Sequence, residues 1–155
     1  MHLYFRHTLI GTIGIAERRG AICNLYFQQQ FPYPDAALCR TDLLQEAFRQ
    51  LDAWLAGSIR TFSLPLEPAP TPFARCVREA LLCIPPGAVS TYSGVAEAIL
   101  HPHAARAVGS ACSRNPLPLF IPCHRVVPAS GGTGLYRGGA ALKSTLLELE
   151  QRRTA

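Results

Sequence analysis

The chain has 155 residues, 48% of them hydrophobic and 16% charged, which excludes a disordered chain and allows one domain, or a small lobe joined to a larger one, with a buried core. No apolar run reaches the roughly 18 residues of a membrane-spanning helix. The net charge of +5 falls entirely in residues 73–155, which carry nine basic and four acidic side chains. Such a charge imbalance is typical of proteins that bind a polyanionic partner, although a solvated basic surface explains it equally well.

Residues 1–68 are predicted to form a small lobe of β-strands and one helix. The segment 3–27 is rich in aromatic and β-branched residues and is interrupted by glycines, a pattern typical of short strands. Residues 41–57 follow the helical period, with Thr41 or Asp42 as the N-cap.

A proline-rich linker is expected between two lobes. Residues 62–72 contain four prolines, which cannot continue a helix and therefore favour extended chain. We place the boundary there, so that residues 69–155 form the second lobe. The expected fold class is α/β (α+β): an N-terminal sheet-plus-helix lobe, then a mainly helical lobe.

The second lobe is predicted to contain a helix-turn-helix. An amphipathic helix over 73–84 precedes two shorter helical segments, 90–100 and 101–115. Such pairs are also common as plain packing units. The last segment has almost no bulk apart from Arg106, which in a nucleic-acid groove could fill the gap left by an extruded base. Its other residues are small: Ala104, Ala105, Ala107, Gly109, Ser110 and Ala111.

The six cysteines are expected to be reduced thiols. The start of the chain lacks the pattern of a signal peptide, so we expect a cytoplasmic location (nuclear in a eukaryote), where disulfides are rare. No C-x-x-C pair is present. Cys76 and Cys83 lie seven residues apart in a helical pattern and are expected on one face, in the core.

Cys123 and His124 stand side by side, ahead of five glycines in residues 131–139. A thiol becomes a nucleophile as its thiolate, and a neighbouring base helps to form it. Adjacent strand residues face opposite sides, so the pair can cooperate only where the chain bends, which Pro122 allows. A buried cysteine beside a surface histidine remains an equally good interpretation of these residues alone.

The motifs around this pair resemble a known family. "NPLPLFIPCHRVV", "GGTGLYRGG" and "LKSTLLELE" are similar to the methylated-DNA–protein-cysteine methyltransferases, or O6-alkylguanine-DNA alkyltransferases. The P-C-H-R-V core is highly specific, and the resemblance extends over essentially the whole chain. It implies irreversible transfer of an alkyl group from O6-alkylguanine in duplex DNA to an internal cysteine, once per molecule, with O4-alkylthymine as a second candidate substrate. It also implies a monomer without cofactor.

The resemblance implies roles for individual catalytic residues. Cys123 matches the acceptor, and His124 the histidine that takes the thiol proton through a bound water. Glu150 matches the acid that orients this histidine. Asn115 matches the asparagine that braces the turn beneath the nucleophile.

The resemblance likewise implies how DNA and substrate are held. Arg106 matches the finger that replaces the flipped base, and Tyr92 the tyrosine that pushes its phosphate round. The small helix residues expected at the DNA are Ala105, Gly109 and Ser110. The expected substrate pocket consists of Tyr136, Val126, Pro118, Arg137 and Gly138.

Two arginines depart from the family pattern. Arg78 stands where an aromatic residue is frequent, and Arg137 where a small residue is common. Gly138 leaves space beside the sulfur and Pro118 offers a flat apolar surface, so alkyl groups larger than methyl, including benzyl, are expected to react. Arg137 would meet phosphate if it points outward and would narrow the pocket if it folds inward. No N-terminal ligand set matches the zinc site of some relatives, so no metal is expected.

Two other functions need weighing. Non-catalytic alkyltransferase-like proteins bind the same lesion, but they usually have tryptophan in place of the acceptor, and Cys123 argues against them. A helix-turn-helix regulator would need base-reading polar side chains on its second helix. The predicted helix in residues 101–115 offers alanines instead, which argues against a regulator.

Overall fold

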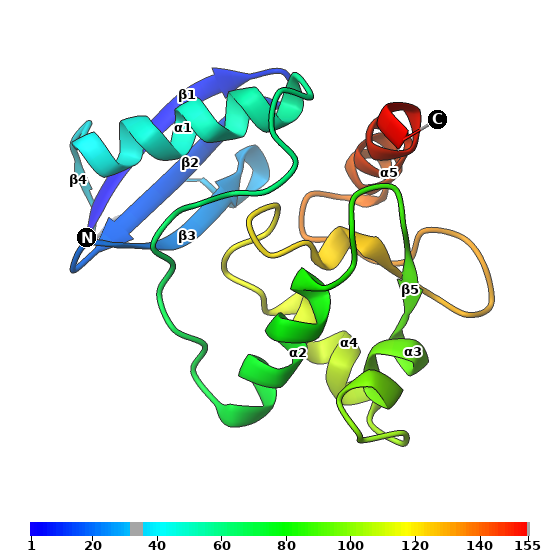
Figure 1. Cartoon of the computed structure of the whole chain (residues 1–155). Helices are drawn as coiled ribbons and strands as arrows, with labels where there is room; N and C mark the ends of the chain where they lie inside the picture. Colours follow the sequence, from blue (N-terminus) through cyan, green and yellow to red (C-terminus); the bar gives the residue numbers. More distant parts are fainter. Residues whose placement is uncertain (32–35, 155) are drawn as a thin grey trace. The chain divides into compact units, whose positions relative to one another are not determined.

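The structure is a computed structural model that describes residues 1–31 and 36–154 (Figure 1). Contacts within the chain separate it into two compact units, Met1–Glu67 and Pro68–Ala155. The first unit consists of a sheet and a helix, and the second is mainly helical. The expected mixed α and β fold class is therefore confirmed. No helix in the described part of the chain is long and apolar enough to cross a membrane.

A four-stranded sheet forms the base of the first unit. Its strand order is β3-β2-β1-β4, with β1, β2 and β3 antiparallel and β4 parallel to β1. A short 3-10 helix, η1 (Gln28–Gln30), follows β3. The strands are β1 (His2–Thr8), β2 (Gly11–Arg18), β3 (Ala21–Phe27) and β4 (Ala37–Leu38).

Helix α1 (Asp42–Leu55) lies across this sheet (Figure 1). Of the two N-caps that the sequence allows, Thr41 is the one used: its hydroxyl accepts a hydrogen bond from the Leu44 N–H at 3.2 Å. The buried face of α1 packs on β1 and β2, where Tyr4 and Phe48 meet edge to face with ring centroids 5.9 Å apart. Burial of this apolar face stabilises the helix more than its intrinsic propensity does.

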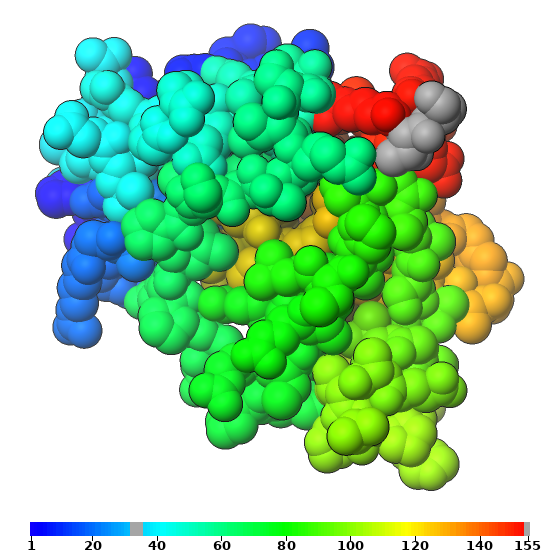
Figure 2. Space-filling model, viewed as in Figure 1, coloured from blue at the N-terminus to red at the C-terminus, as the bar shows by residue number. Residues whose placement is uncertain are grey.

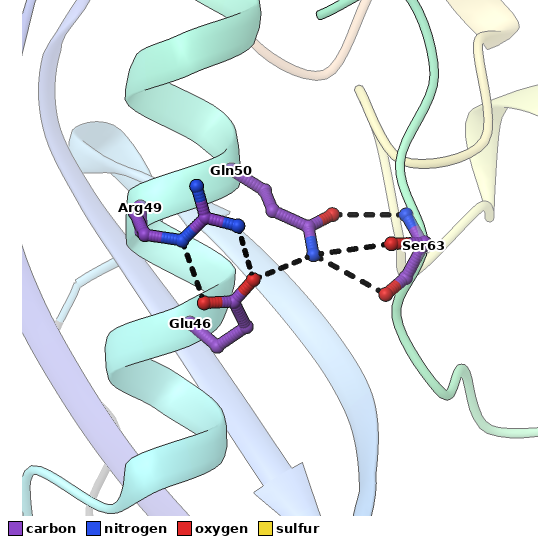
Figure 3. Close-up of polar contacts among 4 residues, drawn as sticks. All are labelled: Glu46, Arg49, Gln50 and Ser63. Carbon is purple, nitrogen blue, oxygen red and sulfur yellow. Dashed lines mark hydrogen bonds and ion pairs between the residues drawn. The ribbon is translucent and has the colours of Figure 1, made fainter.

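Polar contacts join α1 to the chain that follows it (Figure 3). The side chain of Gln50, 5% exposed, accepts a hydrogen bond from the Ser63 N–H at 2.9 Å and donates to the Ser63 carbonyl at 3.2 Å. Gln50 also donates to Glu46 at 3.0 Å, and Glu46 in turn accepts two hydrogen bonds from Arg49. A buried amide thus has partners at both ends, as burial of a polar group requires.

The predicted linker is extended, but its first part is attached to the sheet. The Ile22 N–H donates to the Pro65 carbonyl and the Glu67 N–H to the Ile22 carbonyl, both at 2.8 Å. These bonds pair residues around Leu66 with β3 in parallel. The chain between the two units is therefore shorter than the proline pattern suggests.

The first helix of the second unit is α2 (Pro72–Leu82), which Thr71 caps through a hydrogen bond from the Ala74 N–H at 3.1 Å. The two remaining strands form a parallel pair. The elements that follow are β5 (Ser90–Thr91), α3 (Tyr92–Ala98), α4 (Ala105–Ser113), η2 (Cys123–Arg125), β6 (Val126–Val127) and α5 (Ala140–Thr154).

Helices α3 and α4 contact each other and form the predicted helix-turn-helix. Thr91 caps α3 by accepting from the Gly94 N–H at 2.9 Å. In the space-filling view, the yellow-green segment with α3 and the chain leading to α4 forms part of the surface (Figure 2). His101 and His103 in this connection are exposed.

All six cysteines are free thiols, as expected. The prediction that Cys76 and Cys83 lie in the core is wrong. Cys83 is exposed and Cys76 is only half-buried. Helix α2 ends at Leu82 and buries only Val77 and Leu81, so Cys83 lies beyond the helix whose face it was expected to extend.

Candidate active site

The chain bends sharply at the Cys123–His124 pair, as cooperation between the two residues requires. The bend is one turn of 3-10 helix, η2, in which the Arg125 N–H donates to the Pro122 carbonyl at 3.1 Å. Cys123 is 6% exposed and His124 is fully buried. The alternative interpretation, a buried cysteine beside a histidine on the surface, is therefore wrong, because His124 is buried as well.

Asn115 holds the loop that leads into this bend. Its side-chain nitrogen donates to the Ile121 carbonyl at 3.1 Å, and its side-chain oxygen accepts from the Leu117 N–H at 3.0 Å. The Cys123 N–H donates to the same Ile121 carbonyl at 2.8 Å. Asn115 is buried, so these bonds are shielded from water. The Asn115 side-chain amide and the Cys123 backbone N–H thus donate to the same carbonyl oxygen.

A buried cluster of three charged or titratable side chains lies behind His124. The ring Nε2 of His124 is hydrogen-bonded to Glu150, which is 1% exposed and comes from α5. Arg125 donates to the same carboxylate through Nε at 2.9 Å and Nη2 at 2.5 Å, and through Nη1 to the Ile84 carbonyl at 2.7 Å. The Glu150 carboxylate therefore fixes the ring of His124 and is itself fixed by Arg125.

Burial keeps Cys123 and His124 neutral at pH 7. It raises the pKa of Cys123, and the hydrogen bond from Asn115 and the positive charge of Lys143 oppose this shift only in part. Burial lowers the pKa of His124 despite the opposing effect of Glu150. Burial alone would raise the pKa of Glu150, but bonds from His124 and Arg125 outweigh it, so this pKa lies below its ordinary value. At neutral pH the proton is therefore on the sulfur and the negative charge on Glu150.

Helix α5 also brings an unpredicted cation to the site. Lys143 is 1% exposed, and its Nζ donates to the Val126 carbonyl at 2.7 Å and to the Leu135 carbonyl at 3.4 Å. The same Nζ lies 6.0 Å from the centre of the Tyr92 ring. Burial lowers the pKa of this ammonium group, and the nearby Cys123 and Cys112 sulfurs counteract the shift. The spacing of Lys143, Leu146 and Glu150 on α5 turns all three inward.

Cys123 lines a cavity of about 670 Å³. The walls come from α4, from the chain at residues 134–137 and from the first turn of α3. The lining residues are Tyr92, Gly109, Ser110, Cys112, Ser113, Cys123, Pro128, Gly134, Leu135, Tyr136 and Arg137.

Five residues expected at the DNA or in the pocket thus line this cavity: Tyr92, Gly109, Ser110, Tyr136 and Arg137. Pro118 and Val126 are buried and Gly138 is half-buried, and none of the three is among the lining residues. On α4, Ala105 is half-buried and Arg106 is exposed, and neither is among the lining residues. Gly109 packs near Tyr92, where a Cβ would meet the ring at 3.7 Å.

Arg137 folds inward. Its Nη1 donates to the main-chain oxygen of Asn115 at 3.0 Å, and its side chain lines the cavity. Of the two orientations that the sequence leaves open for Arg137, the structure has the one that narrows the pocket.

Besides Ser113, Pro128, Gly134 and Leu135 in the cavity wall, three ionisable residues of the site escaped sequence reasoning. Lys143 and Arg125 lie in the quoted motifs, but a lysine or arginine there gives no sign of burial. Cys112 is one of six cysteines and had no distinguishing neighbour. Its pKa is raised to about 12, mainly by burial. In the described residues, no group of three or more His, Cys, Asp or Glu side chains is placed to hold a metal ion.

Comparison with known proteins covers both units. Residues 1–68 match the ribonuclease-like domain of 6-O-methylguanine DNA methyltransferase, and residues 72–152 match its DNA binding domain. A methylated-DNA–protein-cysteine methyltransferase of Mycobacterium leprae is 42% identical over 92% of this chain and 87% of its own length. The inducible enzyme of that name from Bacillus subtilis is 35% identical over 97% of this chain and 85% of its own.

A solved structure agrees with these relatives. The crystal structure of Mycobacterium tuberculosis OGT in complex with DNA has a TM-score of 0.91 to this chain at 36% identity, covering 99% of this chain and 94% of its own. The chain therefore belongs to the 6-O-methylguanine DNA methyltransferase family.

Proposed function

We propose that this protein repairs O6-alkylguanine in duplex DNA by moving the alkyl group to Cys123, once per molecule. The observation that carries the proposal is a buried thiol at the wall of a cavity of about 670 Å³, beside a histidine that a carboxylate orients. This volume lies within the range of about 300–1,000 Å³ that is usual for small-molecule sites, so a flipped base fits. Residues 69–155 would carry both DNA binding and transfer.

The chemistry needs one proton transfer and one displacement. The Cys123 thiol loses its proton to His124, whose Nε2 is already bonded to Glu150, so the proton arrives at Nδ1. The thiolate attacks the alkyl carbon in line with the C–O6 bond. The S–C bond forms as the C–O6 bond breaks, and the guanine leaves with the proton returned to it. The product is a thioether, which has no route back to the thiol.

The base must leave the duplex before this can happen, because its O6 substituent lies within the stack. The exposed Arg106 on α4 would fill the vacated place, and the small residues of α4 would let the helix approach the groove closely. Tyr92, at the cavity wall, would turn the phosphate of the extruded nucleotide. The excess of basic side chains in residues 73–155 supports binding to phosphates.

Two narrower statements accompany the proposal. O4-alkylthymine is a second candidate substrate, because its alkyl group is also bound to an exocyclic oxygen of a flipped base. Six free thiols are typical of a reducing compartment, so we propose a cytoplasmic location, or a nuclear one in a eukaryote. The non-catalytic alternative, a lesion-binding protein, is disfavoured because a cysteine lines the cavity, next in the chain to a histidine that Glu150 orients.

The test is intact-protein mass spectrometry after mixing with an oligonucleotide duplex that holds one O6-methylguanine. The protein mass should rise by one methylene group, with one lesion repaired per protein, and peptide mapping should place the label on Cys123. Cys123→Ser should bind the duplex and gain no mass. Cys39→Ser, at an exposed thiol of the first unit, should behave like the parent. Repair of many lesions per protein, or a label on Cys112, would contradict the proposal.

A further inference from the structure

The second unit contains a second cavity, lined by residues of α2, of α4 and of the chain that follows α4. Its volume is about 470 Å³, within the range of about 300–1,000 Å³ that is usual for small-molecule sites. Helices α2 and α4 contact each other (Figure 1). The cavity shares Ser110 with the first cavity, which Cys123 lines, but it has its own walls.

Small side chains on α4 leave room for an apolar occupant. Ala107 and Ala111, one turn apart, line the cavity, and their side chains end at Cβ. From α2 come Phe73, Val77 and Leu81, all of them apolar. Removing apolar surface from water is favourable, so these walls favour an occupant with an apolar body.

Two arginines give the cavity a positive charge. Arg78 comes from α2 and is half-buried, and Arg114 follows α4 and is exposed. No acidic side chain is among the described residues that line the cavity. An anion with an apolar body therefore complements these walls in charge as well as in polarity. The planar guanidinium group of arginine also matches the two oxygens of a carboxylate.

We propose that this second cavity binds a small apolar monoanion, such as an aryl carboxylate. The apolar body would lie between α2 and α4, and the anionic group would meet the guanidinium groups of Arg78 and Arg114. Such binding needs no alkyl transfer. The site can therefore be tested independently of the proposed function.

The second cavity adjoins the support of the nucleophile. Asn115 and Ile121 both line it. The Ile121 carbonyl accepts hydrogen bonds from the Asn115 side chain at 3.1 Å and from the Cys123 N–H at 2.8 Å. A ligand that packs against this segment stabilises it against local opening. The backbone amides of residues 117–123 should therefore exchange more slowly when the cavity is occupied.

The experiment compares two fluorescent probes of similar shape, the anionic anilinonaphthalene sulfonate and the neutral phenylnaphthylamine. Fluorescence titration of the full chain at pH 7 gives a Kd for each probe. Arg78→Met and Arg114→Met remove a charge but keep an unbranched apolar chain. Each should weaken binding of the anion by roughly two- to fivefold and leave the neutral probe unchanged. Arg152→Met is the matched control: this arginine is exposed on α5, and both affinities should equal the parent's.

A second pair of variants locates the probes. Ala111→Phe on α4 and Ala74→Phe on α2 fill the cavity from two of its walls. Each should weaken both probes about tenfold or more, because the apolar body loses its place. Far-ultraviolet circular dichroism checks that each variant is folded, and the two methionine variants decide the question where a phenylalanine variant is not. In the parent, the sulfonate should slow amide exchange in residues 117–123.

Four outcomes would overturn the site. Parental affinities in both folded phenylalanine variants would place the probes elsewhere. An anion affinity that falls in Arg137→Met, but not in Arg78→Met or Arg114→Met, would place the probe in the first cavity. Equal weakening of both probes in the arginine variants would remove the selection for an anion. A parent that binds neither probe would leave this face to DNA or to a second protein. Unchanged amide exchange at saturating sulfonate would refute the contact with the nucleophile's support.

Discussion

We predict that replacing the buried carboxylate of Glu150 lowers the free energy of unfolding strongly. In Glu150→Gln, one amide oxygen must serve the His124 ring and the Arg125 guanidinium that two carboxylate oxygens serve now. The amide nitrogen, which is a donor, would face another donor, either the His124 ring or the Arg125 guanidinium. Arg125, itself only 6% exposed, would keep its charge without a counter-charge. The variant has the shape of the parent, so the change is electrostatic.

The expected magnitude follows from burial. Removing one partner of a buried ion pair costs about 3–5 kcal/mol of unfolding free energy. Glu148→Gln is the control from the same helix, where the glutamate is 65% exposed and lies 3.6 Å from Arg152. An exposed pair at this spacing contributes no more than about 0.5 kcal/mol. The two substitutions are chemically identical, and burial alone should separate them by several kcal/mol.

Urea unfolding followed by far-ultraviolet circular dichroism measures the difference at pH 7. The pKa of Glu150 in the folded protein lies below the ordinary 4.5, so its contribution is complete above that pH. As the pH falls through the lower, folded value, the carboxylate is protonated and the gap between the two variants should close. A gap below about 1 kcal/mol at pH 7 would refute the ion-pair reasoning, and so would a gap that widens on acidification.

Two further predictions concern DNA and the first unit. Arg106→Ala should slow alkyl transfer from duplex DNA far more than from the free base, since only the duplex requires extrusion; equal losses with both substrates would assign Arg106 a structural role. Thr41→Ala removes the N-cap of α1 and should lower the unfolding free energy by about 1 kcal/mol. Thermal or urea unfolding measures this loss, and an unchanged midpoint would contradict the cap.

Local signals account for what the sequence predicted well. Helix α1 has a regular apolar face and a capping threonine, and both are visible in one continuous stretch of sequence. The bend at Cys123 follows from Pro122 and from the need of two adjacent side chains to cooperate. Strand pairing is different, because it joins distant segments. Nothing near Ala37 indicates that β4 adds to β1 in parallel, so the sheet order needed the structure.

The same distinction holds within the site. The motif around Cys123 is contiguous and could be recognised, whereas the surroundings of Arg125 and Lys143 come from elsewhere in the chain. Arg125 binds the Ile84 carbonyl, 41 residues away, and Lys143 binds the Val126 carbonyl, 17 residues away. Charged residues are usually exposed, so no sequence pattern would have placed these two inside.

The resting state of the site fits an acceptor that is used once. Burial disfavours both the Cys123 thiolate and the His124 imidazolium, so the proton stays on the sulfur in the protein without substrate. A permanently ionised thiolate would react with small electrophiles and metal ions, and each such event would consume a molecule. In the proposed reaction, a bound base would exclude water and bring the alkyl carbon into line with the sulfur, and the leaving guanine would take up the proton. The thiol would then ionise only in the complex where its charge is used.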